Sequence, residues 1–131
     1  MKFFEGQTSS MKKIFTEKDV KTFSNISMDK NPIHLDEKFA KKSIFKTRIV
    51  HGILVSSLIS SVIANKLPGP GSIYLNQTLN FIKPVFLGDE ITASVTISKY
   101  NPEKNNFFLK TTCTNQDNKI VIDGNARILL R

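Results

Sequence analysis

The sequence predicts an α+β domain in which one curved antiparallel sheet wraps around a single buried helix. From Gly52 to Asn65 the chain is apolar nearly all round, which is typical of a helix that is covered on most sides. From Ser72 onward it reads as consecutive strands with no helix between them, which favours an antiparallel sheet. Both the apolar helix and the apolar face of the sheet must be shielded from water. The simplest arrangement packs the helix against that face of the sheet.

Length and composition fit one domain over residues 1–131. The chain is 40% hydrophobic, which is enough for a core at this size. Residues 1–11 are expected to be a loose lead-in without the apolar segment of a signal peptide. No run of eighteen apolar residues predicts a membrane span. The single cysteine, Cys113, excludes an internal disulfide and a cysteine-based metal site, and it fits a reducing cytoplasm.

The N-terminal part predicts one short strand and one capped helix. Lys12 to Phe15 has strand character. Thr16 reads as a helix N-cap with Asp19 three residues later, an Asp variant of the capping box. Apolar residues then follow at helical spacing, at Val20, Phe23 and Ile26. We expect this helix to end near Ser27.

A polar segment follows that helix. Pro32 disfavours a helical conformation at Asn31, so residues 29–33 are expected to form a fixed loop. Asp36 then opens a second short helix that runs through Ala40.

The central helix, which starts at Gly52, should end at the breaker Leu67-Pro68-Gly69-Pro70-Gly71. Four strands are predicted after it, over residues 72–83, 91–97, 106–115 and 120–130. Gly124 lies inside the last of these and is interpreted as the mark of a β-bulge.

Asp29 and His34 are the first candidates for chemistry. A carboxylate and an imidazole held together can polarise one water and return a proton elsewhere on a substrate, and such proton transfer is worth about 10²–10⁴-fold in rate. The alternative is that Asp29 caps a turn and His34 only packs. Asn31 and Pro32 favour the catalytic interpretation, because they fix the loop that carries the pair. His51 reads as a structural histidine that tethers the loop, and two histidines argue against a multi-histidine metal site.

Gly52 is the second candidate. The first N–H groups of a helix lack intrahelical partners and lie at the positive end of the helix dipole. A glycine there admits a ligand closely. A thioester carbonyl at that point would be stabilised as it becomes enolate-like, and one such donor is worth about 2.7–4 kcal/mol. The alternative is simply a helix start at which a side chain would clash.

The formal net charge is +8, and four basic residues lie close together just before this helix: Lys41, Lys42, Lys46 and Arg48. These four residues, the basic cluster, are either a solvated surface or a dock for an anionic partner. No aromatic-interleaved basic motif or zinc pattern supports nucleic acid as that partner. A phosphate-bearing small molecule and an acidic carrier protein fit equally well.

Several spaced motifs agree in order along residues 12–131. They are Asp29-x-Asn31-Pro32-x-His34-x-Asp36, Phe45-x-x-x-Ile49-Val50-His51-Gly52, Leu67-Pro68-Gly69-x-Gly71-Ser72-Ile73-Tyr74-Leu75 and Phe81-x-x-Pro84-Val85-x-x-Gly88-Asp89. Together they resemble the (R)-specific enoyl-CoA hydratases of the MaoC-like group.

The resemblance implies a hot-dog fold, a homodimer and reversible syn hydration of a trans-2-enoyl-CoA to the (R)-3-hydroxyacyl-CoA, with no cofactor and no metal. It implies that Asp29 and His34 are the catalytic pair and that Gly52 supplies the oxyanion-hole N–H. Asn31 would support the loop and Ser60 would lie beside the catalytic groups. The remaining expected substrate contacts are Ile63, which would bear on pocket depth, and the basic cluster, which would meet the phosphates of CoA.

Three alternatives concern substrate, catalysis and partner. The same residues would serve a 3-hydroxyacyl-[acyl-carrier-protein] dehydratase of fatty-acid synthesis, whose carrier is also acidic. A non-catalytic hot-dog module that binds acyl thioesters would not need the intact Asp29–His34 pair. A nucleic-acid-binding domain is less favoured than either of these.

The sequence leaves open which member of the Asp29–His34 pair takes the first proton, because a coupled pair need not have a unique order.

Overall fold

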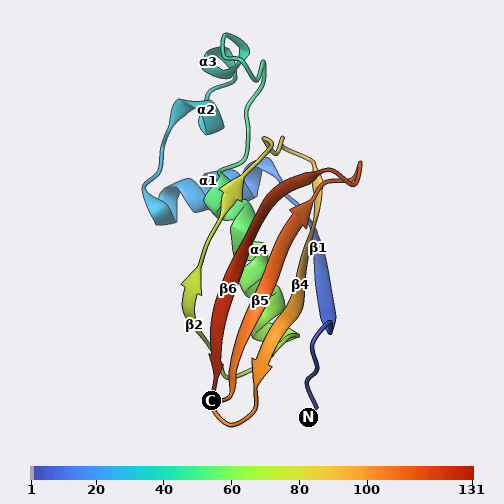
Figure 1. Cartoon of the computed structure of the whole chain (residues 1–131). Helices are drawn as coiled ribbons and strands as arrows, with labels where there is room; N and C mark the ends of the chain where they lie inside the picture. Colours follow the sequence, from blue (N-terminus) through green and yellow to red (C-terminus); the bar gives the residue numbers. More distant parts are fainter. Residues whose placement is uncertain (1) are drawn as a thin grey trace.

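The computed structural model describes residues 2–131 as one curved antiparallel sheet with a long helix against it (Figure 1). The strands are β1 (Thr8–Ile14), β2 (Ser72–Gln77), β3 (Asn80–Phe81), β4 (Glu90–Asn101), β5 (Asn106–Thr114) and β6 (Ile120–Leu130). The helices are α1 (Glu17–Ser27), α2 (Pro32–Leu35), α3 (Glu37–Lys41) and α4 (Gly52–Asn65). The strand order is β1-β4-β5-β6-β2, and β3 also pairs with β6. This is the predicted hot-dog arrangement.

The core lies between α4 and the concave face of the sheet. Residues alternate along β4, so that Ile91, Val95 and Ile97 are buried while their neighbours are more exposed. They belong to one apolar cluster with Val55 and Ile59 of α4. Each such side chain contributes about 1.5–3 kcal/mol by leaving water. This packing fixes the position of α4, and therefore of its first residue, Gly52.

α4 is covered on most sides, as predicted, but one of its faces is exposed. Ile53 is 57% exposed, and Ser60 is also exposed. The strand β2, which ends the sheet on this side, carries the exposed apolar residues Ile73 and Leu75. A helix face with one exposed isoleucine and several serines therefore lies beside the edge strand β2 in the single chain. No helix among residues 2–131 is both long and apolar enough to cross a membrane.

The first strand starts earlier than predicted. Thr8 to Met11 pair with β4, with Thr8 opposite Thr96, so the expected loose lead-in over residues 1–11 is wrong for these four residues. Residue 1 lies outside the described residues. The segment is polar because it forms an edge strand with only one partner strand, and its alternation is too weak to indicate burial.

Gly124 does not mark a bulge. It pairs with Thr111 in regular register, and the register shift between β5 and β6 falls at Cys113 and Thr114. A Cβ built on Gly124 would overlap the carbonyl oxygen of Thr78, which lies between β2 and β3. Glycine is therefore required by the close crossing of another backbone.

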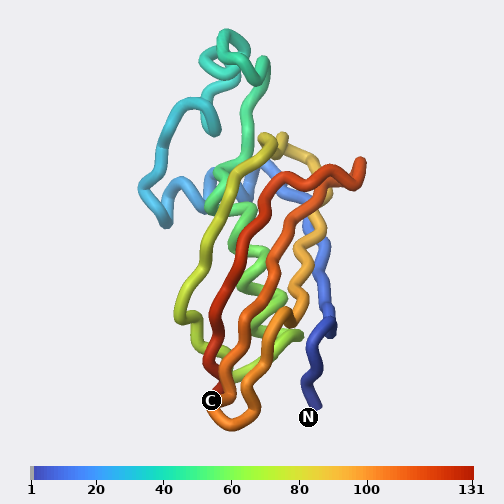
Figure 2. Tube along the Cα trace, viewed as in Figure 1, coloured from blue at the N-terminus to red at the C-terminus, as the bar shows by residue number. Residues whose placement is uncertain are grey.

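The helices α2 and α3 stand apart from the sheet, above the start of α4 (Figures 1 and 2). The capping box of Thr16 and Asp19 is present at α1, as predicted. The expected loop over residues 29–33 is shorter than predicted, because Pro32 is the first residue of α2. Proline tolerates that position, since the first helical N–H has no intrahelical partner. Asp36 caps α3 by accepting hydrogen bonds from two backbone N–H groups, as expected.

Candidate active site

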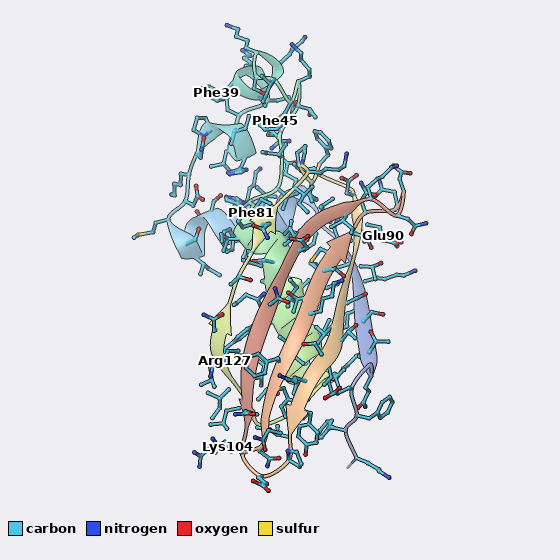
Figure 3. The ribbon with its side chains drawn as sticks, in the orientation of Figure 1. Phe39, Phe45, Phe81, Glu90, Lys104 and Arg127 are labelled. Carbon is cyan, nitrogen blue, oxygen red and sulfur yellow. The ribbon has the colours of Figure 1, made fainter. Side chains whose placement is uncertain are left out.

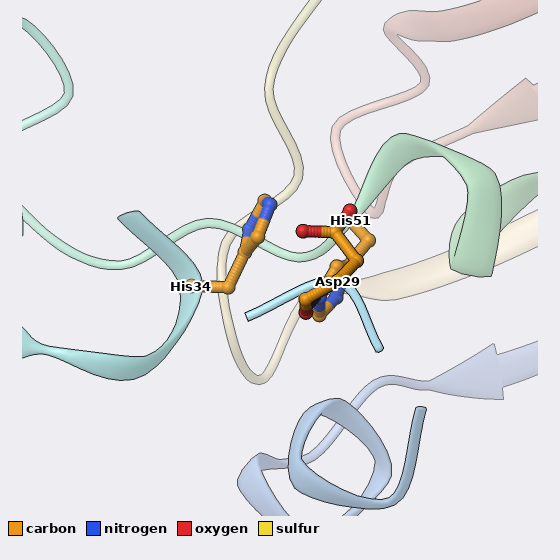
Figure 4. A group of neighbouring side chains, drawn as sticks. All are labelled: Asp29, His34 and His51. Carbon is orange, nitrogen blue, oxygen red and sulfur yellow. Dashed lines mark hydrogen bonds between the residues drawn. The ribbon is translucent and has the colours of Figure 1, made fainter. Parts of the chain in front are cut away.

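Three polar side chains meet near the start of α4: Asp29 from the loop after α1, His34 from α2, and His51 from the residue before α4 (Figure 4). A carboxylate oxygen of Asp29 and one ring nitrogen from each histidine all lie within 4.8 Å of one another. Asp29 is exposed, whereas both histidines are buried. The predicted pair is therefore brought together, with a second histidine beside it.

His34 is held in one tautomer. Its Nδ1 lies 2.7 Å from the carbonyl oxygen of Ile49. A carbonyl only accepts, so Nδ1 carries a proton and donates it, and in the neutral ring Nε2 keeps its lone pair. The side chain is only 8% exposed, which holds the ring in this orientation. His34 thus offers Nε2 as a proton acceptor.

Asp29 is positioned by its own turn. Its N–H donates to Ser27 Oγ at 3.1 Å, and its Oδ1 accepts from the N–H of Asn31 at 3.3 Å. The Asn31 side chain in turn accepts from the N–H of Ile33 at 3.2 Å and caps α2. These Asx-type bonds fix the loop that joins the two catalytic candidates.

His51 lies directly behind the pair. Its Nε2 is 3.2 Å from the backbone oxygen of Asp29 and 3.1 Å from Ser24 Oγ. Its ring stacks on His34 with centroids 3.8 Å apart and meets the edge of Phe23 at 4.8 Å. Burial lowers the pKa of His51, although the hydrogen bond to Asp29 opposes this. The prediction of a structural histidine that tethers the loop is confirmed by these contacts.

The geometry of this trio does not suit a metal ion. His34 uses Nδ1 on Ile49 and His51 uses Nε2 on Asp29, which leaves one nitrogen on each ring. The two rings are stacked with an interplanar angle of 27°. An ion must lie near the plane of each ring that ligates it, and two stacked rings do not share such a point at about 2.0–2.1 Å from both nitrogens.

Gly52 is the first residue of α4, so its N–H has no intrahelical acceptor. It lines a cavity of about 420 Å³ together with residues 81–85 and with Phe45, Ile49, Val50, Ile53 and Ile122. The phenyl ring of Phe81, which is 53% exposed, covers the glycine: a Cβ on Gly52 would lie 2.6 Å from that ring. Figure 3 shows Phe45 and Phe81 at the end of the molecule that carries α2 and α3. A mostly apolar cavity thus reaches the N-terminus of α4, and its wall includes Ile49, whose carbonyl oxygen accepts the hydrogen bond from His34.

Ser60 and Ile63 are not brought to the pair. Ser60 lies about 12 Å along α4 from Gly52, at 1.5 Å per residue. It lines a separate groove between α4 and β2, so the expectation that it lies beside the catalytic groups is not met within the chain. Ile63 is 2% exposed and belongs to the core cluster, so it lines neither of these two cavities.

The basic cluster divides into two parts. Arg48 is 16% exposed and binds Glu17 at 3.0 Å and Glu37 at 2.9 Å, so its assignment as a free substrate contact is wrong. The hydrogen bond from Arg48 lowers the pKa of Glu17, and those from Thr47 and Arg48 lower the pKa of Glu37. The three lysines of the cluster are exposed, and none of them lines the cavity at Gly52.

Sequence reasoning missed three residues of this site. Lys83 is the charged residue that lines the cavity at Gly52, Phe81 covers the glycine, and Ser24 contacts His51. The spacing of Phe23 and Ile26 on α1 indicated only a core face and gave Ser24 no role. Lys83 and Phe81 lie on a strand-like run about thirty residues after Gly52, and only tertiary structure brings them to it.

Comparison with known proteins gives consistent results. Residues 5–121 match the MaoC like domain family. The chain is 46% identical over 126 residues to the (R)-specific enoyl-CoA hydratase of Rhodospirillum rubrum, covering 96% of this chain and 87% of that protein. It is 38% identical to a mitochondrial 3-hydroxyacyl-[acyl-carrier-protein] dehydratase of Arabidopsis thaliana, covering 90% and 72%. The solved structure of the (R)-hydratase from Aeromonas caviae involved in PHA biosynthesis superimposes with a TM-score of 0.95 at 40% identity, covering 98% of each chain.

The family match covers residues 5–121, and the alignments with the Rhodospirillum rubrum and Aeromonas caviae proteins cover 96% and 98% of this chain. The chain therefore belongs to the MaoC-like domain family.

Proposed function

We propose that this protein is an (R)-specific enoyl-CoA hydratase, a hydro-lyase that reversibly adds water to a trans-2-enoyl-CoA. The observation that carries the proposal is that Asp29 and His34 meet next to His51, the residue before Gly52, whose N–H lacks an intrahelical acceptor and which lines an apolar cavity. Asp29 and His34 do not line that cavity themselves; Ile49, which accepts the hydrogen bond from His34, does. The relatives named as (R)-specific enoyl-CoA hydratases support the same reaction.

The substrate's thioester oxygen accepts a hydrogen bond from the Gly52 N–H, at the positive end of α4. Electron density then moves from the C2–C3 double bond toward this oxygen, and C3 becomes electrophilic. The apolar walls near Phe45 and Val85 receive the hydrocarbon part of the acyl group.

The pair acts on the water. A water bound between the Asp29 carboxylate and His34 Nε2 attacks C3, so that an O–C3 bond forms while the double-bond electrons pass to the enolate. The proton released from that water goes to the pair, and the pair delivers a proton to C2 on the same face. The reaction needs no oxidant or reductant, because water and the enoyl thioester together contain every atom and electron of the product.

A carrier-linked substrate is the second candidate. The relative named as a 3-hydroxyacyl-[acyl-carrier-protein] dehydratase is 38% identical, and a net charge of +8 suits an acidic carrier as well as CoA. The loss of enoyl absorbance with crotonyl-CoA tests the proposal, and crotonyl linked to an acyl carrier protein separates the two candidates by kcat/KM. We expect turnover of crotonyl-CoA with the higher kcat/KM. No turnover of either substrate would refute the proposed function. A much higher kcat/KM for the carrier-linked substrate would show that the acyl carrier protein, and not CoA, carries the natural substrate.

The lysines of the basic cluster are expected to act on binding alone. Replacing Lys41, Lys42 and Lys46 by Gln should raise KM for crotonyl-CoA several-fold at low salt while kcat stays within about two-fold, because exposed charges attract an anionic substrate and are screened by salt. Crotonyl-N-acetylcysteamine, which lacks the phosphates, should not respond. Initial rates at two salt concentrations measure both effects. An equal rise of KM for the truncated substrate would show that the lysines act through the fold.

Arg48→Gln is the matched control for that variant. It removes one positive charge from the same segment, but a charge that is already paired with Glu17 and Glu37. We expect a small fall in melting temperature with KM unchanged, because ion pairs to exposed carboxylates contribute little to stability.

A homodimer is the proposed assembly. The edge of β2 is unpaired among the described strands, and the adjoining face of α4 exposes Ile53. Edges of this kind are usually covered, and a two-fold axis covers both copies at once. Sedimentation equilibrium at micromolar concentration should give twice the mass of 14.8 kDa. A species of the single-chain mass would contradict the dimer.

A further inference from the structure

We propose that His51 is a positioning residue of the active site, which holds Asp29 through its backbone and His34 through ring stacking while its own imidazole stays neutral. The inference rests on the proposed function, because positioning has meaning only if Asp29 and His34 carry the reaction. His51 itself is buried and touches neither water nor substrate in this mechanism.

The contacts of His51 join both members of the pair to the body of the protein. Nε2 reaches the backbone oxygen of Asp29 at 3.2 Å, and the ring face lies on His34 with centroids 3.8 Å apart. On the other side, Nε2 is 3.1 Å from Ser24 of α1 and the ring meets the edge of Phe23. One imidazole therefore ties the catalytic loop to α1 and to the start of α4.

The tautomer follows from the Asp29 contact. A backbone carbonyl can only accept, so Nε2 of His51 carries the proton, and Nδ1 is the unprotonated nitrogen of a neutral ring. Ser24 Oγ then accepts from the same N–H. Nδ1 is buried and has no hydrogen-bond partner among the described residues.

Neutrality has a consequence for the reaction. A proton on Nδ1 would be a buried N–H without an acceptor, next to a ring that must itself become cationic when it takes a proton. The titratable groups that face His51 are Asp29 and His34. Because the ring stays neutral, it presents an uncharged aromatic face to protonated His34 and leaves the Asp29 carboxylate as the partner of that charge.

Two substitutions of His51 distinguish the effect of its hydrogen-bond donor from the effect of the space that its side chain fills. His51→Gln can place an amide N–H near the position of Nε2, whereas His51→Leu fills similar space without a donor. We expect His51→Leu to lower kcat on crotonyl-CoA about 10-fold or more, because a misplaced catalytic group is costly even when substrate still binds. KM should change less than about two-fold, and His51→Gln should recover part of kcat, because it restores the donor to Asp29 but not the ring stacked on His34. The circular dichroism spectrum and melting temperature establish that each variant is folded.

Nitrogen NMR of the wild-type imidazoles provides a readout that does not depend on activity. The chain has two histidines, and a His34→Asn variant assigns their signals. We expect the His51 ring to give the pattern of a neutral Nε2–H tautomer at pH 7 and to be protonated only below the ordinary pKa of about 6.5, because burial lowers the pKa of His51.

The outcomes distinguish the inference from the proposed function. If wild-type protein does not hydrate crotonyl-CoA, the function fails, and the NMR pattern alone decides whether His51 is the neutral anchor. If the wild type is active, a folded His51→Leu variant with full kcat overturns the inference, as does a folded His51→Gln variant no better than His51→Leu. A cationic or Nδ1–H ring near pH 7 overturns it as well.

Discussion

Asp29→Asn and His34→Ala are each expected to lower kcat for hydration of crotonyl-CoA by at least about 10². Asparagine keeps the shape of Asp29 but removes the charge that orients water and accepts a proton. Alanine at position 34 removes Nε2, the ring nitrogen left free by the bond from Nδ1 to Ile49. Because neither change touches Gly52 or the cavity walls, KM should change much less than kcat. Steady-state kinetics of the purified variants measure the effect.

Asp117→Asn is the matched control for the carboxylate. Asp117 is exposed in the turn between β5 and β6, where its backbone N–H donates a hydrogen bond to Asn115 Oδ1. This variant should keep wild-type kcat and KM. A folded Asp29→Asn or His34→Ala enzyme with near wild-type kcat would remove that residue from the proposed mechanism.

Gly124→Ala is expected to destabilise the fold by about 3 kcal/mol or more, the upper end of what overpacking costs. The added methyl group overlaps the Thr78 carbonyl oxygen, and backbone on both sides is held by sheet pairing. For a domain of 131 residues this corresponds to a fall in melting temperature of about 10 °C. Thermal unfolding followed by circular dichroism measures it.

Asn125→Ala is the control for that effect. It lies next to Gly124 on β6, is exposed, and contacts residues 77 and 78 through its backbone atoms. Its melting temperature should stay within about 2 °C of the wild type, as for most surface substitutions. If Gly124→Ala is as stable as Asn125→Ala, the crossing of Thr78 over β6 is not as close as described.

Features that depend on local chemistry were predictable. The boundaries of α1 follow from the capping box at Thr16, and those of α4 follow from an apolar run between Gly52 and a Pro-Gly breaker. The pairing of Asp29 with His34 was also predictable, because a short turn and a proline-led helix leave five positions little freedom.

Features that depend on contacts between distant parts of the chain could not be predicted from the sequence. The start of β1 at Thr8 is decided by β4, almost ninety residues later. Gly124 suggested a bulge because nothing nearby in sequence reveals the crossing backbone of Thr78. Arg48 looked like part of a free basic cluster, since its partner Glu17 lies thirty-one residues away on α1. Ser60 lies too far along α4 to reach the pair within one chain.

The stereochemical course of hydration tests the central claim most directly. If one pair, Asp29 and His34, both activates the water and returns the proton, OH and H must be added to the same face of the double bond. Hydration of crotonyl-CoA in D₂O, followed by chiral analysis and proton NMR of the product, should give the (R) configuration at C3 with deuterium at C2 on the same face as the hydroxyl. An (S) product, or deuterium on the opposite face, would contradict this account of the site.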